Sequence, residues 1–336
     1  MAILSPNVLT LADWAKRLDP EGKVDTIVEL LSQKNEILDD MLWMEGNLPT
    51  GHRTTIRTGL PALAWRLLNQ GIQPTKSTTM QIDDTCGMLE GYSEVDKDLA
   101  DLNGNTAQFR LSEASAFIEG LNQNMAGTLF YGNTAVNPER FLGLAPRFSA
   151  ISGATNGQNV ISGAGSASNN TSIWLVCWGP TTVHGIFPKA SKAGVTHTDK
   201  GIVTIENTNG QAGFRSEAYR EHWQWKCGLS VRDWRYVVRI ANIDVTQLTK
   251  DYSAGADVVD LMTQALEKAF DLKTGRPVWY VNRKIRSFLR RQMVNHKNMF
   301  MADFDMQSGE KPHVLTFGGF PVRLCDQLLN TEATVS

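Results

Sequence analysis

The chain has 336 residues, of which 42% are hydrophobic and 20% charged, and its formal net charge is −2 at pH 7. This length is enough for one large domain or two ordinary ones, and the composition is that of a soluble globular protein. The nearly balanced charge and the pI near 6.3 argue against a dedicated nucleic-acid-binding protein, which is usually strongly basic.

The first 45 residues are predicted to form an N-terminal arm. Leu9 to Leu18 and Val24 to Leu42 have the apolar spacing of short amphipathic helices, and Asp19 to Gly22 interrupts them. A basic segment followed by a long apolar core is missing, so we expect no signal peptide. Two separate helices of this length cannot form a core alone. We therefore expect the arm to dock on another part of the protein.

Residues 46–91 are predicted to form a long two-stranded ribbon. Gly51 to Gly59 and Lys76 to Leu89 are both rich in threonine, which favours strands. The tip between them holds three large apolar side chains, Trp65, Leu67 and Leu68. Because an isolated hairpin is only marginally stable in water, the ribbon must lie on its own body or on a neighbouring molecule.

The two sides of this ribbon carry opposite charge. The first strand and the tip contain His52, Arg53, Arg57 and Arg66, whereas the region after the second strand contains Asp83, Asp84, Glu90, Glu94, Asp96, Asp98 and Asp101. This opposition suits charge pairing between subunits, and two solvated faces of one hairpin would explain it equally well. The candidate inter-subunit contacts are Arg53, Arg57, Trp65, Arg66, Leu67, Leu68, Lys76, Asp83 and Asp84.

Leu111 to Gly132 is the clearest helix in the sequence. A single apolar stripe runs along it, formed by Ala114, Ile118, Leu121, Met125 and Leu129. Ser112 is suited to the N-cap, and Gly132 to the C-terminal end. Gly120 and Gly127 lie off the stripe, and each costs about 1 kcal/mol relative to alanine. We therefore predict that another element crosses the helix closely at both glycines, although a core helix with two tolerated glycines is a simpler interpretation.

The second half of the chain is predicted to alternate strands and helices. Residues 149–172 are rich in Gly, Ser and Asn and predict a surface loop. Strands are predicted over 173–188, 219–240 and 314–324, with a short one at 278–281, and helices over 257–270 and 283–298. The apolar parity changes after Asp233, which predicts a bulge or a turn there.

No motif in the sequence requires catalysis. Glu217 and Glu221 could supply acid and base groups in a β-rich enzyme, but they lie in strand-patterned sequence without metal-binding spacing. The six histidines are dispersed, and a GxSxG elbow and a complete P-loop are both missing. The sequence therefore predicts neither a cofactor nor a metal.

The segment 283–297 is the one plausible nucleic-acid feature. Its helix would gather five cations, Arg283, Lys284, Arg286, Arg290 and Arg291. These would attract phosphate without reading base sequence, as in a nucleic-acid-binding module. A solvated helix face, or a surface that pairs with acidic groups of another copy, is the alternative that we favour.

Apolar runs and cysteines indicate a cytoplasmic environment. The longest apolar run is about six residues, Ile173 to Trp178, far short of the roughly 20 needed to span a bilayer. Four scattered cysteines without CxxC spacing indicate reduced thiols. We expect no membrane partner.

Several segments, taken in order, match one protein family. GHRTTIRTGLPALAWRLLNQGIQPTKSTT looks like an extended E-loop, and EGYSEVDKDLADLNGN before the long helix looks like the entry to a spine helix. SIWLVCWGPTTVHGIFPKASKAG and WKCGLSVRDWRYVVRIANID look like strand blocks, and GRPVWYVNRKIRSFLRRQ like an axial strand-then-helix unit. Together they resemble the major capsid proteins of tailed, podovirus-type bacteriophages, which have the Hong Kong 97-type fold.

The resemblance implies an α+β chain with four parts. These are an N-arm (1–45), an E-loop (46–91), a peripheral domain (92–148 and 202–250, with a spine helix at 112–132) and an axial domain (149–201 and 251–336). The strand–Asn–helix unit around Asn282 comes after two strand-rich blocks instead of directly after the spine helix, which indicates a rearranged strand order.

The resemblance also implies a structural role. Copies would be made in the cytoplasm of a host bacterium and would self-assemble as hexamers and pentamers into the icosahedral shell of a virion around dsDNA. The N-terminus lacks a long coiled coil that could serve as a fused scaffold, so a separate scaffolding protein is expected. A portal and a decoration or cement protein are the other implied partners.

Overall fold

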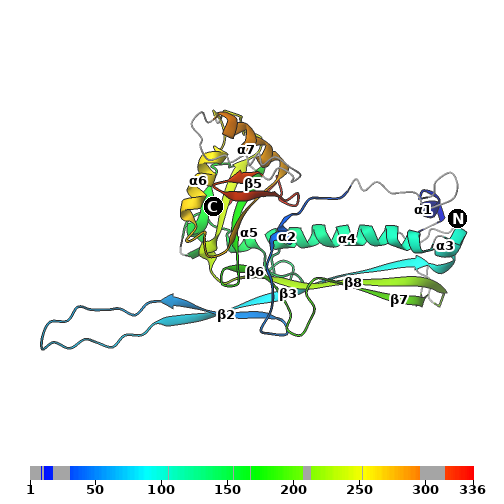
Figure 1. Cartoon of the computed structure of the whole chain (residues 1–336), viewed down its shortest axis with the longest axis horizontal. Helices are drawn as coiled ribbons and strands as arrows, with labels where there is room; N and C mark the ends of the chain where they lie inside the picture. The colour runs from blue at the N-terminus through cyan, green and yellow to red at the C-terminus, as the bar shows by residue number, and fades with distance from the viewer. Residues whose placement is uncertain are drawn as a thin grey trace.

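The computed structural model describes residues 9, 11–17, 31–104, 106–153, 155–166, 168–206, 213–251, 253–295 and 315–336. The molecule is elongated: a helix lying over strands extends from one side of a compact body, and a two-stranded ribbon projects from the other side (Figure 1). One twelve-stranded sheet connects the parts, with the hydrogen-bonded order β11-β12-β10-β5-β6-β8-β3-β2 along its main path. The ribbon is therefore continuous with the strands of the body.

The ribbon and the helix-covered layer share one long strand. Their elements are β2 (Gly51–Gly59), β3 (Thr78–Asp96), α3 (Lys97–Asp101), η1 (Leu102–Gly104), α4 (Thr106–Tyr131), β7 (Val195–Glu206) and β8 (Arg215–Val231). The first part of β3 pairs with β2 from Thr78 to Thr85, and the second part pairs with β8 from Cys86 onward. The predicted two-stranded ribbon is confirmed, but its second strand runs past residue 91 to Asp96.

The long helix is confirmed, and its predicted start is wrong. It begins at Thr106, and Ser112 is an interior residue whose hydroxyl donates to the Phe109 carbonyl at 2.8 Å. The helix extends further because Phe109 is fully buried in a small core with Val95 and Ala100. Of the predicted stripe, Ile118 alone is exposed. The helix ends as predicted, at the residue before Gly132.

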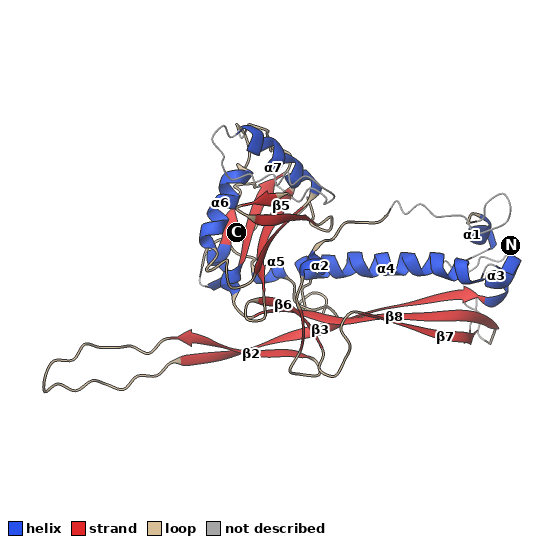
Figure 2. Cartoon of the chain, in the orientation of Figure 1, coloured by secondary structure: helices blue, strands red, loops and turns tan. Residues whose placement is uncertain are grey.

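The compact body has a hydrophobic core on each face of its central strand, β5 (Asn170–Trp178). Trp174, Val176 and Trp178 enter one core, and Ile173 and Leu175 enter the other. Because both faces are covered, the strand reads as an uninterrupted apolar run. In Figure 2, α6 and α7 lie to one side of the strands of the body. The remaining elements of the body are α5 (Leu144–Arg147), β6 (Val183–Phe187), η4 (Trp234–Tyr236), β9 (Val237–Asp244), α6 (Val258–Lys268), β10 (Arg276–Val281), α7 (Arg283–Asn295), β11 (Thr316–Phe317) and β12 (Phe320–Leu324).

The predicted strands and helices of the second half are largely confirmed. The parity change after Asp233 is the turn η4, where the Asp233 carboxylate accepts from the Arg235 N–H. The loop predicted over 149–172 is wrong in part. It contains η2 (Thr155–Asn159) and β4 (Val160–Ser162), which pairs in parallel with β9 and buries Val160 and Ile161. The Asn159 side-chain amide fixes this segment, because it donates to the Val237 carbonyl at 3.0 Å.

The N-terminal segment docks along α4, as expected for an arm. Arg17 pairs with Glu113 at 2.6 Å, and the amide of Gln123 donates to the Leu31 carbonyl at 2.8 Å. The segment contains α1 (Leu11–Ala15), α2 (Ile37–Asp40) and β1 (Trp43–Glu45). The helix predicted over 24–42 is wrong over 31–36, where Asn35 forms a β-bridge with Cys325, and is confirmed only over Ile37–Asp40, which forms α2. Its first part, 24–30, lies outside the described residues.

Candidate assembly surfaces

The ribbon tip presents apolar side chains that its own chain does not cover. Residues 60–77 connect β2 to β3 and project away from the body (Figure 1). Trp65 is fully exposed, and Leu68 is 90% exposed. Other large apolar side chains exposed at the tip are Leu60, Leu63, Leu67 and Ile72. Exposed apolar residues grouped in this way are typical of a surface that another molecule covers.

The charges of the ribbon pair mostly within the chain. Arg53 and Asp83 are cross-strand partners, and Arg53 donates two hydrogen bonds of 2.6 Å to the carboxylate. These bonds hold the pKa of Asp83 below its usual value and raise that of Arg53. Asp84 is buried and accepts from Arg147 at 2.7 Å. The opposition of Arg53 and Asp83 therefore needs no second subunit, and Asp84 already has a partner within its own chain, so a contact of Asp84 with another subunit stays a prediction.

Three candidate cations of the ribbon point to solvent. Arg57, Arg66 and Lys76 are exposed, and Arg66 directly follows Trp65. A contact between these side chains and another subunit stays a prediction.

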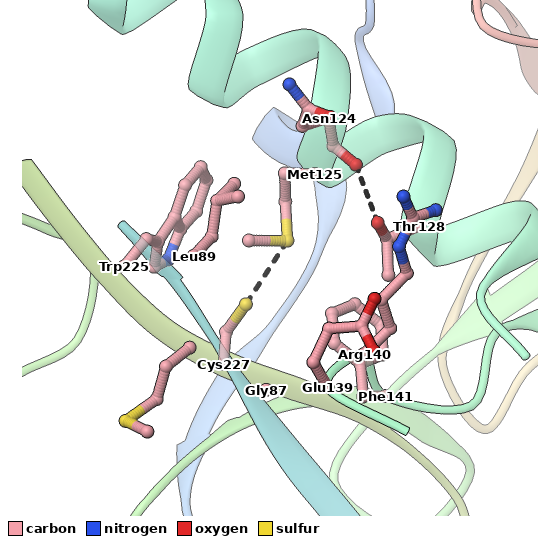
Figure 3. Close-up of a pocket in the computed structure, with 11 residues that line it drawn as sticks. Gly87, Leu89, Asn124, Met125, Thr128, Glu139, Arg140, Phe141, Trp225 and Cys227 are labelled. Atoms are coloured by element: carbon pink, nitrogen blue, oxygen red, sulfur yellow. Dashed lines mark hydrogen bonds between the residues drawn. The ribbon is translucent and has the colours of Figure 1, made fainter. Parts of the chain in front are cut away.

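An apolar groove lies between α4 and the strands below it. We name it the α4 groove, and its lining includes Gly87, Leu89, Gly91, Phe117, Gly120, Leu121, Asn124, Met125, Phe141 and Cys227. It has two adjoining hollows of about 210 and 290 Å³, which share Leu89 and Asn124. Figure 3 shows the first hollow, where Met125 of α4 lies over Cys227 of β8 with the sulfur atoms 3.2 Å apart.

The two glycines of α4 differ in what surrounds them. A Cβ at Gly127 would lie 3.2 Å from the side-chain oxygen of Gln327, so the C-terminal segment approaches there. A Cβ at Gly120 would meet no atom within 4 Å. No described element of the chain itself crosses closely at Gly120, which lies open at the edge of the α4 groove. A crossing by another subunit stays a prediction.

The two candidate catalytic carboxylates do not form an active site. Glu217 and Glu221 both lie in β8, and Glu217 is exposed beside Lys97 at 3.6 Å. Glu221 is buried and engaged, with its oxygens 2.7 Å from Arg110 and 3.1 Å from His197. A carboxylate held in this way stabilises the joint between α4, β7 and β8.

The basic helix α7 keeps most of its charge exposed. Arg283 is neutralised by Asp326 through two hydrogen bonds of 2.8 Å. Arg286 is partly buried, and burial together with Arg290 and Arg283 lowers its pKa. Lys284, Arg290 and Arg291 are exposed and form the accessible cationic face. A phosphate-binding face, a solvated face and a surface that pairs with acidic groups of another copy all stay predictions for this helix.

Among the described residues, no group of three or more His, Cys, Asp or Glu side chains is arranged to hold a metal ion. Within the same ranges, no helix has the length and apolar character to cross a membrane.

Comparison with known proteins decides the family. A family model described as Major capsid protein GP7 matches residues 19–336. The chain belongs to this major capsid protein family. This capsid protein is 37% identical to a chain in the structure of bacteriophage Epsilon15, with a TM-score of 0.79. The match covers 100% of this chain and 99% of the Epsilon15 chain. No match was found among curated proteins.

More distant solved structures are also similar. The capsid of bacteriophage JBD30 is 10% identical over 89% of this capsid protein and 92% of its own chain, with a TM-score of 0.49. The encapsulin SrpI of Synechococcus elongatus is 12% identical over 71% of this chain and 98% of its own, with a TM-score of 0.45.

This capsid protein therefore has the mixed α/β Hong Kong 97-like fold and forms the icosahedral shell of a tailed-phage virion. The predicted family, structural role and virion location are confirmed, and a shell of many copies requires self-association. The alternative of a β-rich enzyme using Glu217 and Glu221 is excluded by the family.

Two features of this capsid protein were not predicted from its sequence. The α4 groove is one, although the facing glycines Gly91 and Gly120 were a usable signal for it. The other is a buried polar joint near the C-terminus, where Glu332 accepts from Tyr131, Ser172 and Arg239. The sequence around Glu332 has no periodicity, so nothing local marks this residue as buried.

Proposed function

We propose that this capsid protein assembles by seating the ribbon tip of one copy in the α4 groove of the next copy. The exposed tip is the observation that carries the proposal. Fully burying one large apolar side chain contributes roughly 1.5–3 kcal/mol, and the tip offers several. Large aromatic anchors often dominate the binding energy of an interface, which favours Trp65 as the central contact.

The α4 groove has the complementary properties. Its lining is mainly apolar, and Met88 beside it is exposed. Gly120 leaves an opening in the surface of α4. A glycine inside a helix costs about 1 kcal/mol relative to alanine, and no described residue of the same chain makes a close contact there that would offset this cost. The exposed Glu139 on the rim could pair with Arg66 beside an inserted Trp65.

In this proposal the parts of the chain have the roles implied by the family resemblance. Residues 46–91 act as the E-loop, α4 as the spine helix, and the N-terminal segment as the N-arm. Two domain limits are better drawn elsewhere. The limit at 201–202 cuts through β7, and β9 pairs with β5 in the compact body, so it belongs with the axial part.

The family resemblance and the charges of α7 support proposals about further partners. Subunits are grouped as hexamers and pentamers, with a separate scaffolding protein, a portal and a decoration protein. The exposed cations of α7, Lys284, Arg290 and Arg291, would face packaged dsDNA and contact phosphates without sequence preference. A rearranged strand order relative to other family members stays a prediction.

Disulfide trapping tests the seating directly. The double variant Arg66→Cys/Glu139→Cys keeps Trp65 and should form reducible cross-links between subunits in assembled particles. The pair Arg66→Cys/Lys284→Cys is the matched control and should not cross-link. The native thiols interfere little, because burial raises the pKa of Cys86 and Cys177 to about 11 and that of Cys325 to about 12. Particles in which both introduced cysteines react with a thiol reagent but do not cross-link would overturn the proposal.

A further inference from the structure

A cluster of five polar side chains, three of them buried and two partly buried, lies where the ribbon joins the body. His52 is near the start of β2, His184 is in β6 and Arg232 follows β8. Asp84 of β3 and Arg147 of α5 complete the cluster. His52 is 8% exposed and His184 is completely buried. The two rings meet edge to face with their centroids 5.9 Å apart.

Arg232 connects His52 to the body. Nη2 of Arg232 lies 2.8 Å from Nε2 of His52, and the backbone N–H of Asn47 lies 3.3 Å from Nδ1. A guanidinium group can only donate, so Nε2 of His52 must be unprotonated to accept. A doubly protonated ring has no lone pair to offer. In the neutral ring the single proton is then on Nδ1, so only Nε2 accepts, and proton uptake at Nε2 places a second donor against the Arg232 guanidinium.

His184 is equally unsuited to a charge. Neither ring nitrogen makes a well-formed hydrogen bond to a described residue, and the hydroxyl of Ser230, its cross-strand neighbour, also lacks a partner among them. A charged imidazolium buried without partners is strongly disfavoured. The ring is therefore stable here only in its neutral form.

The charges around the two rings oppose protonation. The carboxylate of the cluster, Asp84, is engaged by Arg147 at 2.7 Å, so this pair has no net charge. Arg232 then leaves the cluster positive before any histidine is protonated. Arg57 and Arg235 line the same groove of about 620 Å³ as Arg232, and Asp233 in that groove is paired with Arg235. A proton on either ring adds a second positive charge beside Arg232.

The direction of the pKa shifts agrees with this geometry. Burial, followed by Arg232 and His52, lowers the pKa of His184 to about 4, while Asp84 and the Gly179 backbone oppose the shift. Burial and Arg232 also lower the pKa of His52, against Asp84. An opened joint would restore the ordinary value of about 6.5. The opened form therefore binds more protons between pH 6.5 and about 4, so the joint weakens as the pH falls through this window.

We propose that His52 and His184 form a pH-sensitive latch, which holds the base of the ribbon on the body while neutral and releases β2 when protonated. The latch lies between β2, β6 and the end of β8, so its release frees the ribbon to change its angle to the body. This inference goes beyond the docking of the tip and does not depend on it, since every residue of the latch belongs to one chain.

Amide hydrogen exchange of the unassembled full chain tests the latch. Protection in β2 is compared near pH 7.5 and pH 5, after correction for intrinsic exchange rates, with α6 as an internal reference. A shift of the pKa of His184 from 6.5 to about 4 predicts a roughly thirtyfold loss of protection in β2 at pH 5. Protection of α6 should change much less. Protection of β2 that is equal at the two pH values would overturn the proposal.

Two variants separate the latch from general acid sensitivity. His184→Gln cannot titrate and should reduce the loss of β2 protection far below thirtyfold. His222→Gln is the matched control, because His222 stacks on Tyr92 outside the latch. This variant should show the same loss of β2 protection at pH 5 as the wild-type protein. If His184→Gln does not fold, ring resonances of isotopically labelled wild-type protein give the answer. A His184 ring that titrates near pH 6.5 while β2 stays protected would contradict the latch.

Discussion

Arg239 and Glu332 form a buried ion pair, with Nη2 of the arginine 2.9 Å from a carboxylate oxygen, although 93 residues separate them in the chain. Both side chains are about 5% exposed. Arg239 also lies over the ring of Trp174, and Tyr131 at the end of α4 donates its hydroxyl to the other oxygen of Glu332. One carboxylate thus joins the long helix, the central strands and the C-terminal segment.

Glu332→Gln should destabilise the chain strongly. Removing one partner leaves the guanidinium of Arg239 buried without a compensating charge, which typically costs about 3–5 kcal/mol. The free energy of unfolding, measured with urea on unassembled protein, should fall by this amount. The control is Glu206→Gln, which breaks the exposed pair with Arg215 and should change stability by less than about 1 kcal/mol. Equal effects of the two substitutions would show that the joint is not important for stability.

Local patterns in the sequence predicted the elements that depend on local physics. The apolar stripe of α4 and the threonine-rich strands of the ribbon are repeated signals of short range, and both are present in the structure. The start of α4 was predicted wrongly because the first turns of the helix depend on the contact of Phe109 with Val95 and Ala100. Both of these residues precede the helix, so the periodicity of the helix itself does not reveal the contact. The role of Glu332 depends on residues from three distant segments, which no local pattern reveals.

The candidate site was predicted unevenly for the same reason. The tip was found because Trp65, Leu67 and Leu68 are unusual between two polar strands. The pairing of Asp84 within its own chain was not predicted, because it depends on register and on Arg147, which the sequence does not place. The α4 groove required knowledge of which strand lies below Gly120, and this became visible only in the folded chain.

Substitution of Gly120 should affect assembly and leave folding intact. Gly120→Ala adds one methyl group in open space and should raise the stability of the helix by up to about 1 kcal/mol. Gly120→Trp fills the groove and should prevent the tip of a neighbour from binding. The yield of particles by sucrose-gradient sedimentation should therefore be normal for Ala and at least about tenfold lower for Trp, a loss of roughly 1.4 kcal/mol per contact. Normal particles from a folded Gly120→Trp protein would place the tip elsewhere.

The cationic face of α7 should bind dsDNA through phosphates alone. Replacing Lys284, Arg290 and Arg291 together by glutamine should weaken binding to any duplex equally. The slope of log affinity against log salt should fall by about 0.9 for each lost phosphate contact, so by roughly 2–3 in total. Arg283→Gln, at a residue already neutralised by Asp326, serves as the control and should change the slope little. A slope unchanged by the triple substitution would favour a solvated helix face.

The central claim is that the uncovered ribbon tip drives the association of subunits, and removal of the tip tests it most directly. The chain lacking residues 60–74 and the variant Trp65→Ala are expressed, with a scaffolding protein if one is required, and compared with Trp65→Phe, which keeps an aromatic anchor. Negative-stain images of sedimented fractions are then counted for uniform closed particles. The account predicts a soluble, folded chain without shells from the deletion, few shells from Trp65→Ala and near-normal shells from Trp65→Phe. Abundant closed particles of normal size from the deletion would contradict it.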